Sequence, residues 1–86
     1  MNDGAAIEEA VRDLVRSRAA LARDRSDLPD ELPLGAGGLG LDSISLAELL
    51  LDCQRRFGIP APVELLEGPP LTLGRLVAHV RHVAGS

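Results

Sequence analysis

Aromatic residues and lysine are nearly missing from this chain of 86 residues. Phe57 is the only aromatic residue, and all nine basic residues are arginine. A core must therefore be built from aliphatic side chains, and the abundant leucine and alanine favour helices. The net charge is −4. A mildly acidic chain without lysine or base-stacking aromatic rings is poorly suited to bind nucleic acid, so we expect none as a partner.

Cysteine and long apolar runs are also scarce. Cys53 is the single cysteine, so no disulfide forms within the chain. No apolar run approaches the roughly 20 residues of a membrane span, and the N-terminus lacks the basic start and apolar stretch of a secretory signal. We therefore expect no membrane span, a cytoplasmic location and a monomer. The length allows one domain at most, over residues 1–86.

Four stretches show helical periodicity, and none alternates for long enough to predict a strand. The first covers about 3–23, the second about 42–57, a short one about 62–67 and the last about 72–84. Apolar residues of the first stretch recur at spacings of three, four and seven: Ile7, Ala10, Val11, Leu14 and Leu21. The prediction is an all-α, four-helix bundle with three long helices and one short helix.

A long first loop, over 24–41, separates the first two helices of this prediction. It is rich in proline and glycine, which exclude regular structure. A structureless loop of this length is unusual in a small domain, and its five leucines are expected to pin it across the bundle. The run from Gly35 to Gly40 lacks the lysine and Ser/Thr of a phosphate-binding loop, so we interpret it as flexible backbone.

The helix over 42–57 is apolar on two sides. At about 100° per residue, one face is large and includes the only phenylalanine, which predicts the core face: Leu46, Leu49, Leu50, Cys53 and Phe57. On nearly the opposite side lie Ile44, Ala47 and Leu51, flanked by Glu48 and Arg55. A few exposed apolar residues are ordinary, but this group is contiguous and edged by charges. We interpret it as half of an interface.

Ser43 lies at the junction of the glycine-rich loop and this helix. A serine in that position is usually a helix cap, but Asp42 or Ser45 can serve as the cap instead. Unpaired N–H groups and the positive end of the helix dipole favour an anion at such a terminus. Ser43 is therefore compatible with a covalently attached phosphate.

The stretch from Gly38 to Ile59, GLGLDSISLAELLLDCQRRFGI, closely resembles the attachment region of acyl carrier proteins. That family has an Asp-Ser-Leu-like motif where its second helix opens, and here the motif reads Asp-Ser-Ile. The amphipathic first helix, the long loop, the short helix and the Thr-Leu opening of the last helix follow the family order. The resemblance thus covers the whole chain and implies the carrier-protein bundle.

The resemblance implies a non-catalytic carrier that holds biosynthetic intermediates as thioesters. It implies that Ser43 receives 4'-phosphopantetheine from coenzyme A through a phosphopantetheinyl transferase. It also implies that the second helix docks acyl-loading, condensing and tailoring enzymes, through positions that here are Asp42, Ile44, Ala47, Glu48 and Leu51. Arg55 departs from the acidic residues that many acyl carriers have there, so partners are expected to present an acid opposite Arg55.

Two other functions stay open. Peptidyl carriers of the nonribosomal type share the arm but usually have Gly-Gly-His or Gly-Gly-Asp before the serine, so Leu41-Asp42 favours the acyl type. An unmodified helical adaptor would use the apolar group of the second helix to bind one partner. Hydrolase chemistry is disfavoured because a thin bundle offers little pocket for a substrate.

Metal and thiol chemistry are not indicated by the remaining candidates. His79 and His82 are three residues apart, but no further metal ligands are evident. We interpret them as partly solvated residues beside the apolar stripe of the last helix. Cys53 lies mid-helix on the apolar face, which predicts a small buried hydrophobe and not a reactive thiol.

Overall fold

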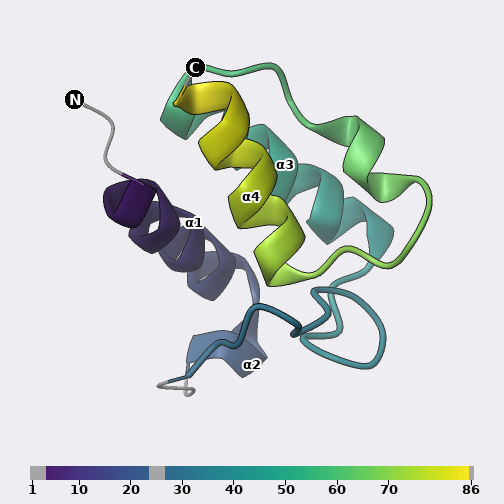
Figure 1. The fold of residues 1–86 in the computed structure, drawn as a ribbon. Coiled ribbons are helices and arrows are strands. Elements are labelled where there is room, and N and C mark those ends of the chain that lie inside the picture. The colour runs from purple at the N-terminus through teal and green to yellow at the C-terminus, as the bar shows by residue number, and fades with distance from the viewer. Residues whose placement is uncertain (1–3, 24–26, 86) are drawn as a thin grey trace.

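The computed structural model describes residues 4–23 and 27–85 and is helical throughout its regular elements. Along the chain these are α1 (Gly4–Arg18), α2 (Ala20–Arg23), α3 (Ser43–Phe57), the 3-10 helix η1 (Val63–Leu66) and α4 (Leu73–Ala84). The three long helices α1, α3 and α4 pack against one another, as Figure 1 shows. The predicted all-α bundle of three long helices is confirmed.

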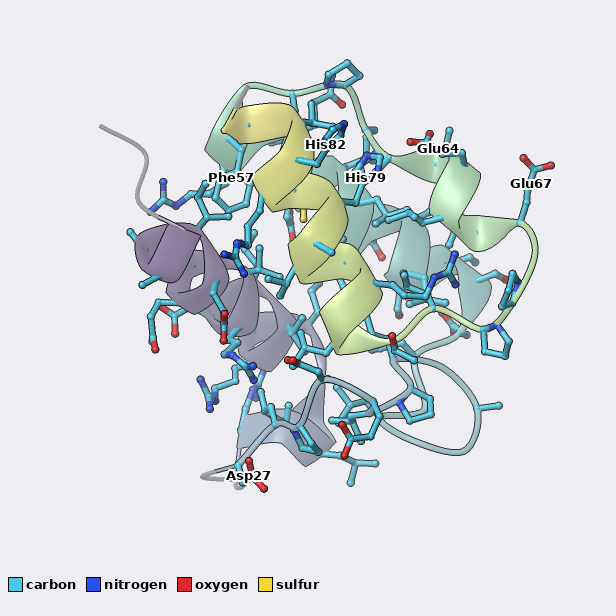
Figure 2. The ribbon with its side chains drawn as sticks, in the orientation of Figure 1. Asp27, Phe57, Glu64, Glu67, His79 and His82 are labelled. Carbon is cyan, nitrogen blue, oxygen red and sulfur yellow. The ribbon has the colours of Figure 1, made fainter. Side chains whose placement is uncertain are left out.

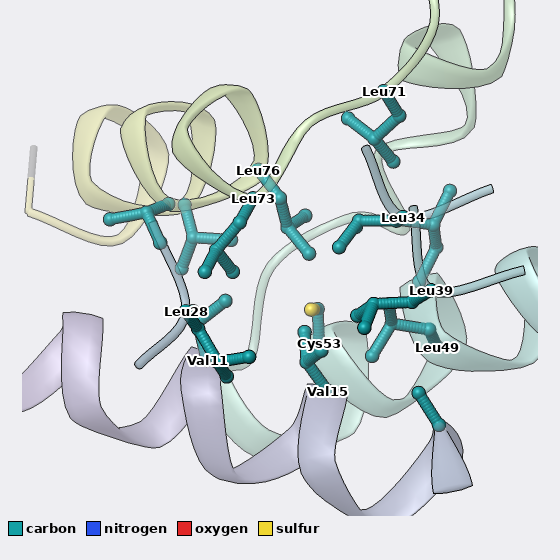
Figure 3. Close-up of a cluster of buried hydrophobic side chains, with 14 of the residues drawn as sticks. Val11, Val15, Leu28, Leu34, Leu39, Leu49, Cys53, Leu71, Leu73 and Leu76 are labelled. Carbon is teal, nitrogen blue, oxygen red and sulfur yellow. The ribbon is translucent and has the colours of Figure 1, made fainter. Parts of the chain in front are cut away.

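The core lies where the three long helices meet the leucines of the first loop (Figure 3). Leu49, Leu50 and Cys53 of α3 have no exposed surface. Around them pack valines of α1, leucines of the loop and the apolar stripe of α4, which include Val11, Val15, Leu34, Leu39, Leu73 and Leu76. Each fully buried Leu or Val contributes about 1.5–3 kcal/mol before entropy is subtracted. The aliphatic core expected from the composition is therefore present.

The ends of α3 and α4 have local sequence causes. The Asp42 side chain accepts a hydrogen bond from the Ser45 N–H, so Asp42 is the N-cap of α3. Gly58 ends that helix with a φ of 66°, a conformation that glycine adopts without strain. Thr72 caps α4 by accepting from the Arg75 N–H. The short helix expected over 62–67 is the 3-10 helix η1, one turn long.

The single helix expected over 3–23 is divided, because the helix is interrupted at Ala19. Its start at residue 3 lies outside the described residues. The buried stripe runs through Val11, Val15, Ala19 and Ala22, at spacings of four, four and three. Leu21 lies at the edge of this stripe and is 63% exposed, so its assignment to the apolar stripe was wrong. Small alanines, and not the larger leucine, face the core at this end.

The run Gly35–Gly40, which we expected to be flexible backbone, forms hydrogen-bonded turns. The Gly38 and Gly40 N–H groups both donate to the Gly35 carbonyl. The Leu34 N–H donates to Leu71 ahead of α4, over 2.9 Å. A Cβ on Gly38 would overlap the Pro33 carbonyl oxygen, so glycine is required for this close approach.

The leucines of the loop are buried as expected. Leu28, Leu32, Leu34 and Leu39 are all less than a tenth exposed, and Leu41 packs partly against the core. At the start of the described loop, Arg12 of α1 donates to the Leu28 carbonyl and forms an ion pair with Asp30. No helix among the described residues has the length and apolarity needed to cross a membrane.

Candidate functional site

Ser43 is the first residue of α3 and is exposed to solvent. The turn at 35–41 leads the chain to this point, and Asp42, one residue before the serine, caps the start of the helix. Since Asp42 supplies the cap, the Ser43 hydroxyl is not needed for that role. Its position gives an incoming enzyme access to the oxygen, and the N–H groups of the first helical turn favour an anion beside it.

Asp42 is held in place by the helix that it caps. Its Oδ1 lies 2.7 Å from the Ser45 nitrogen. Hydrogen bonding to Ser45 holds the pKa of the Asp42 carboxyl below its ordinary value, and the Ile44 N–H acts in the same direction. Asp42 is therefore charged at neutral pH, with its charge offset by the positive end of the helix dipole.

The outer face of α3 carries the exposed apolar residues expected from the helical wheel. Ile44 is 72% exposed and Leu51 is 41% exposed, while Ala47 between them is half-buried. Two further apolar residues, Val63 and Leu66, are exposed on η1, which packs against α3. These side chains give α3 an apolar surface that the bundle itself leaves uncovered.

Arg18 of α1 holds both acidic residues along one edge of α3. Its Nε and Nη2 donate to the two carboxylate oxygens of Asp52, over 2.7 and 3.0 Å. Its Nη1 lies 3.2 Å from Glu48 Oε2. The hydrogen bonds from Arg18 lower the pKa of Asp52 and, reciprocally, raise the pKa of Arg18. We call these three residues the Arg18 clamp. Glu48, predicted to face partners, is thus already engaged within the chain.

The end of α3 beyond the clamp is basic. The Arg55 side chain is 73% exposed, with Nη1 3.7 Å from the Asp52 carboxylate that Arg18 already occupies. The Arg56 guanidinium lies 5.6 Å from the centre of the Phe57 ring, a distance at which a cation–π attraction operates. Arg55 follows Leu51 by one helical turn, so apolar surface and positive charge adjoin on this face.

An apolar groove opens beside the start of α3. It has a volume of about 290 Å³ and lies between the 35–41 turn, α3 and the η1 segment. Leu41 and Leu46 form its wall two residues before and three residues after Ser43, and Leu65 and Leu66 form the wall on η1. Small-molecule sites usually have about 300–1,000 Å³, so the groove suits a short apolar group.

The histidines and the cysteine lie away from this site. Figure 2 shows His79 of α4 beside η1, where its Nε2 is 3.3 Å from Glu64 Oε1. In the part of the chain that the structure describes, no group of three or more potential metal ligands occurs. Burial, and secondarily the charge of Asp52, raise the pKa of the Cys53 thiol to about 11. Cys53 is therefore the small buried hydrophobe that the sequence predicts.

Comparison with known proteins decides the family. A family model described as "Phosphopantetheine attachment site" matches residues 9–80. The chain belongs to this family. The predicted resemblance to carrier proteins is confirmed, and so is the predicted cofactor, 4'-phosphopantetheine in covalent attachment. Comparisons with curated proteins and with solved structures gave no match.

Membership of the phosphopantetheine-attachment family means that the chain carries a covalently attached phosphopantetheine arm. The chain bears the arm as a carrier, and its partners therefore include a phosphopantetheinyl transferase and biosynthetic enzymes. The matched region spans α3, η1 and most of α1 and α4. Sequence reasoning missed one residue of this surface, Arg18. The only signal for it was the i, i+4 pair of acids Glu48 and Asp52, which lie on one edge of the helix and call for a cation opposite.

Proposed function

We propose that the chain is an acyl carrier, a single domain over residues 1–86, in which Ser43 carries the phosphopantetheine arm. The observation that supports this most is that Ser43 is solvent-exposed at the first position of α3, in a chain of the phosphopantetheine-attachment family. In the transfer, the Ser43 oxygen loses its proton and bonds to the phosphorus that carries the pantetheine arm in coenzyme A, while the pyrophosphate P–O bond breaks and adenosine 3',5'-bisphosphate leaves. The neighbouring N-cap is Asp42, so modification of Ser43 removes no cap from the helix.

The start of α3 stabilises the phosphodiester. Helical N–H groups and the positive end of the dipole face the anion, a contribution of about 0.3–1 kcal/mol for an exposed charge. Asp42 opposes the new charge, but the Ser45 N–H already compensates its carboxylate.

The chain's own residues have no catalytic role in this proposal. When bound, the arm supplies a terminal thiol that holds a cargo as a thioester. The protein positions the arm and presents a recognition surface. Cys53, the only thiol of the chain, is buried and held protonated, so it does not compete for the cargo.

The outer face of α3 is the proposed docking surface. Exposed Ile44 and Leu51 supply its apolar contacts, with Ala47 between them. Charged residues at its two ends, Asp42 and Arg55, set the orientation of the partner. Glu48 also lies on this surface, where it is paired with Arg18. Partners are proposed to be the transferase and the acyl-loading, condensing and tailoring enzymes that use the arm. Apolar contacts at the centre of an interface usually carry most of its binding energy.

An acyl cargo fits this structure better than an aminoacyl cargo. The groove beside Ser43 is lined by leucines and prolines, and the ammonium group of an aminoacyl cargo would lose its hydration there. An apolar chain gains by leaving water. Backbone amide shifts of Leu46, Leu65 and Leu71 should therefore move when a short acyl chain is loaded and stay in place when an amino acid is loaded. Identical shifts for both cargoes would remove the argument for the acyl type.

Intact mass after incubation with coenzyme A and a broad-specificity phosphopantetheinyl transferase tests the function. The chain is expected to gain the mass of one phosphopantetheinyl group, and Ser43→Ala is expected to gain nothing. Ser45→Ala, two residues further along the same helix, is the matched control and should be modified like the wild type. No gain by the wild-type chain would favour the unmodified adaptor, and a gain by Ser43→Ala would exclude Ser43 as the attachment residue.

A further inference from the structure

The acidic side chains of α3 are less available to a partner than its basic side chains. Arg18 donates to both oxygens of Asp52 and to Glu48, so the two carboxylates of the helix edge face a guanidinium of the same molecule. Asp52 is also only 15% exposed. A basic group on a partner must compete with Arg18 for these oxygens. Any bonds that it formed there would offset little of the free energy that it loses when it leaves water.

The bases of α3 are more accessible. The Arg55 side chain is 73% exposed, and Asp52, with which it pairs over 3.7 Å, accepts shorter bonds from Arg18. Arg56 is exposed over the face of Phe57. Toward the end of α3, the guanidinium groups of Arg18, Arg55 and Arg56 outnumber the carboxylates of Glu48 and Asp52, so the excess charge at this end is positive. This excess adjoins exposed Leu51 in a chain whose overall net charge is −4.

We infer that the partner surface that fits α3 is an apolar patch bordered by carboxylates, with an acid opposite Arg55. The inference rests on the proposed function, since it uses the outer face of α3 as the docking surface. The Arg18 clamp gives this preference its direction, because it neutralises the acids that would otherwise attract a basic partner. Charge complementarity of this kind sets partner choice and association rate more than total affinity.

Two synthetic helical peptides provide the probes for this preference. Both carry the same leucine face, flanked in one by glutamates and in the other by lysines, with equal numbers of charges. Each is titrated into the isotope-labelled full chain, and the amide shifts of Ile44, Leu51 and Arg55 report binding at α3. The acidic peptide is expected to bind α3 about three-fold more tightly than the basic one, the size of one exposed ion pair. The difference should vanish at about 1 M salt, where charges are screened within about 3 Å.

Two variants identify the groups responsible. Arg55→Glu should abolish or reverse the preference, and Arg18→Met should strengthen binding of the basic peptide, since it releases Glu48 and Asp52. Arg81→Glu, an exposed residue of α4, changes the net charge equally and is the control. It should keep the preference for the acidic peptide at α3.

Tighter binding of the basic peptide at α3 in the wild type would overturn the inference. Equal binding of the two peptides, absence of α3 shifts with either, or equal effects of Arg55→Glu and Arg81→Glu would also overturn it. The proposed function is tested separately, because the mass gain on Ser43 is measured without these peptides. A chain that gains the arm but prefers the basic peptide would retain its function and lose only this partner assignment.

Discussion

The two faces of α3 are both apolar, yet they contact different surroundings. Leu49, Leu50 and Cys53 on the inner face have no exposed surface, whereas Ile44 on the outer face is 72% exposed. The inner residues hold α1, the loop and α4 together. The outer residues contribute little to that packing, and the role that we propose for their apolar character is recognition of partners. One helix thus provides both the core and the proposed docking surface.

Adjacent leucines give the sharpest test of this difference. Leu50→Ala should lower the free energy of unfolding by about 2–5 kcal/mol, because it leaves a cavity in the core. Leu51→Ala makes the same chemical change on the outer face and should cost less than about 1 kcal/mol. Denaturant unfolding of both variants measures the two losses. Losses of similar size would show that the outer face also supports the fold.

Leu51→Glu tests the outer face as a docking surface. Modification of Ser43 by the transferase should slow by about ten-fold, the scale of a central interface contact. The fold should persist, because position 51 is partly exposed and a glutamate there can pair with Arg55 at i+4.

Leu21→Glu is the matched control for this variant, since Leu21 is 63% exposed and lies outside α3. It should be modified at the wild-type rate. A large loss of thermal stability in Leu51→Glu would show that the face with Leu51 packs in the core and is not the docking surface.

Asp42→Ala removes the N-cap of α3, which lies next to Ser43. The first turn of α3 loses the acceptor for the Ser45 N–H, and Tm should fall by about 5 °C. Asp42→Asn is the control, because asparagine caps helices about as well as aspartate. Thermal unfolding followed by circular dichroism measures both. If the alanine variant kept the wild-type Tm, the cap would not hold the helix start in place.

Acid should weaken the Arg18 clamp, which lies along the edge of α3 between its inner and outer faces. Arg18 lowers the pKa of Asp52 in the folded chain, so the unfolded chain takes up this proton first as the pH falls. The stabilisation is complete above about pH 4 and is lost as the pH drops through the lowered value. Its size is at most about 1 kcal/mol for a pair near the surface.

The comparison of wild type with Asp52→Asn isolates this contribution. The variant should lose less stability between neutral and acid pH, as measured by denaturant unfolding at each pH. An unchanged acid dependence in Asp52→Asn would show that the clamp does not stabilise the fold.

Much of α3 could be predicted from sequence because its signals are local. Asp42 and Gly58 mark its ends, and the spacing of its apolar residues separates the two faces. The buried leucines of the first loop could also be predicted, since a loop of this length in a small domain needs apolar contacts to hold it against the bundle.

The remaining features depend on contacts between distant residues. The ion pair of Arg18 with Asp52 joins residues 34 positions apart, and no local pattern specifies it. The interruption at Ala19 has no glycine or proline to mark it, and no local pattern indicates that Ala22 is buried while Leu21 is exposed. The groove near Ser43 requires η1 to lie against α3, which only the folded chain shows.

Fragmentation of the modified chain by mass spectrometry tests the central claim most directly. After modification by the transferase and coenzyme A, the fragments should place the phosphopantetheinyl group on Ser43 alone. Attachment to Ser45, Ser17 or any other residue would contradict the account, because the exposed first position of α3 would then not be the site of the arm.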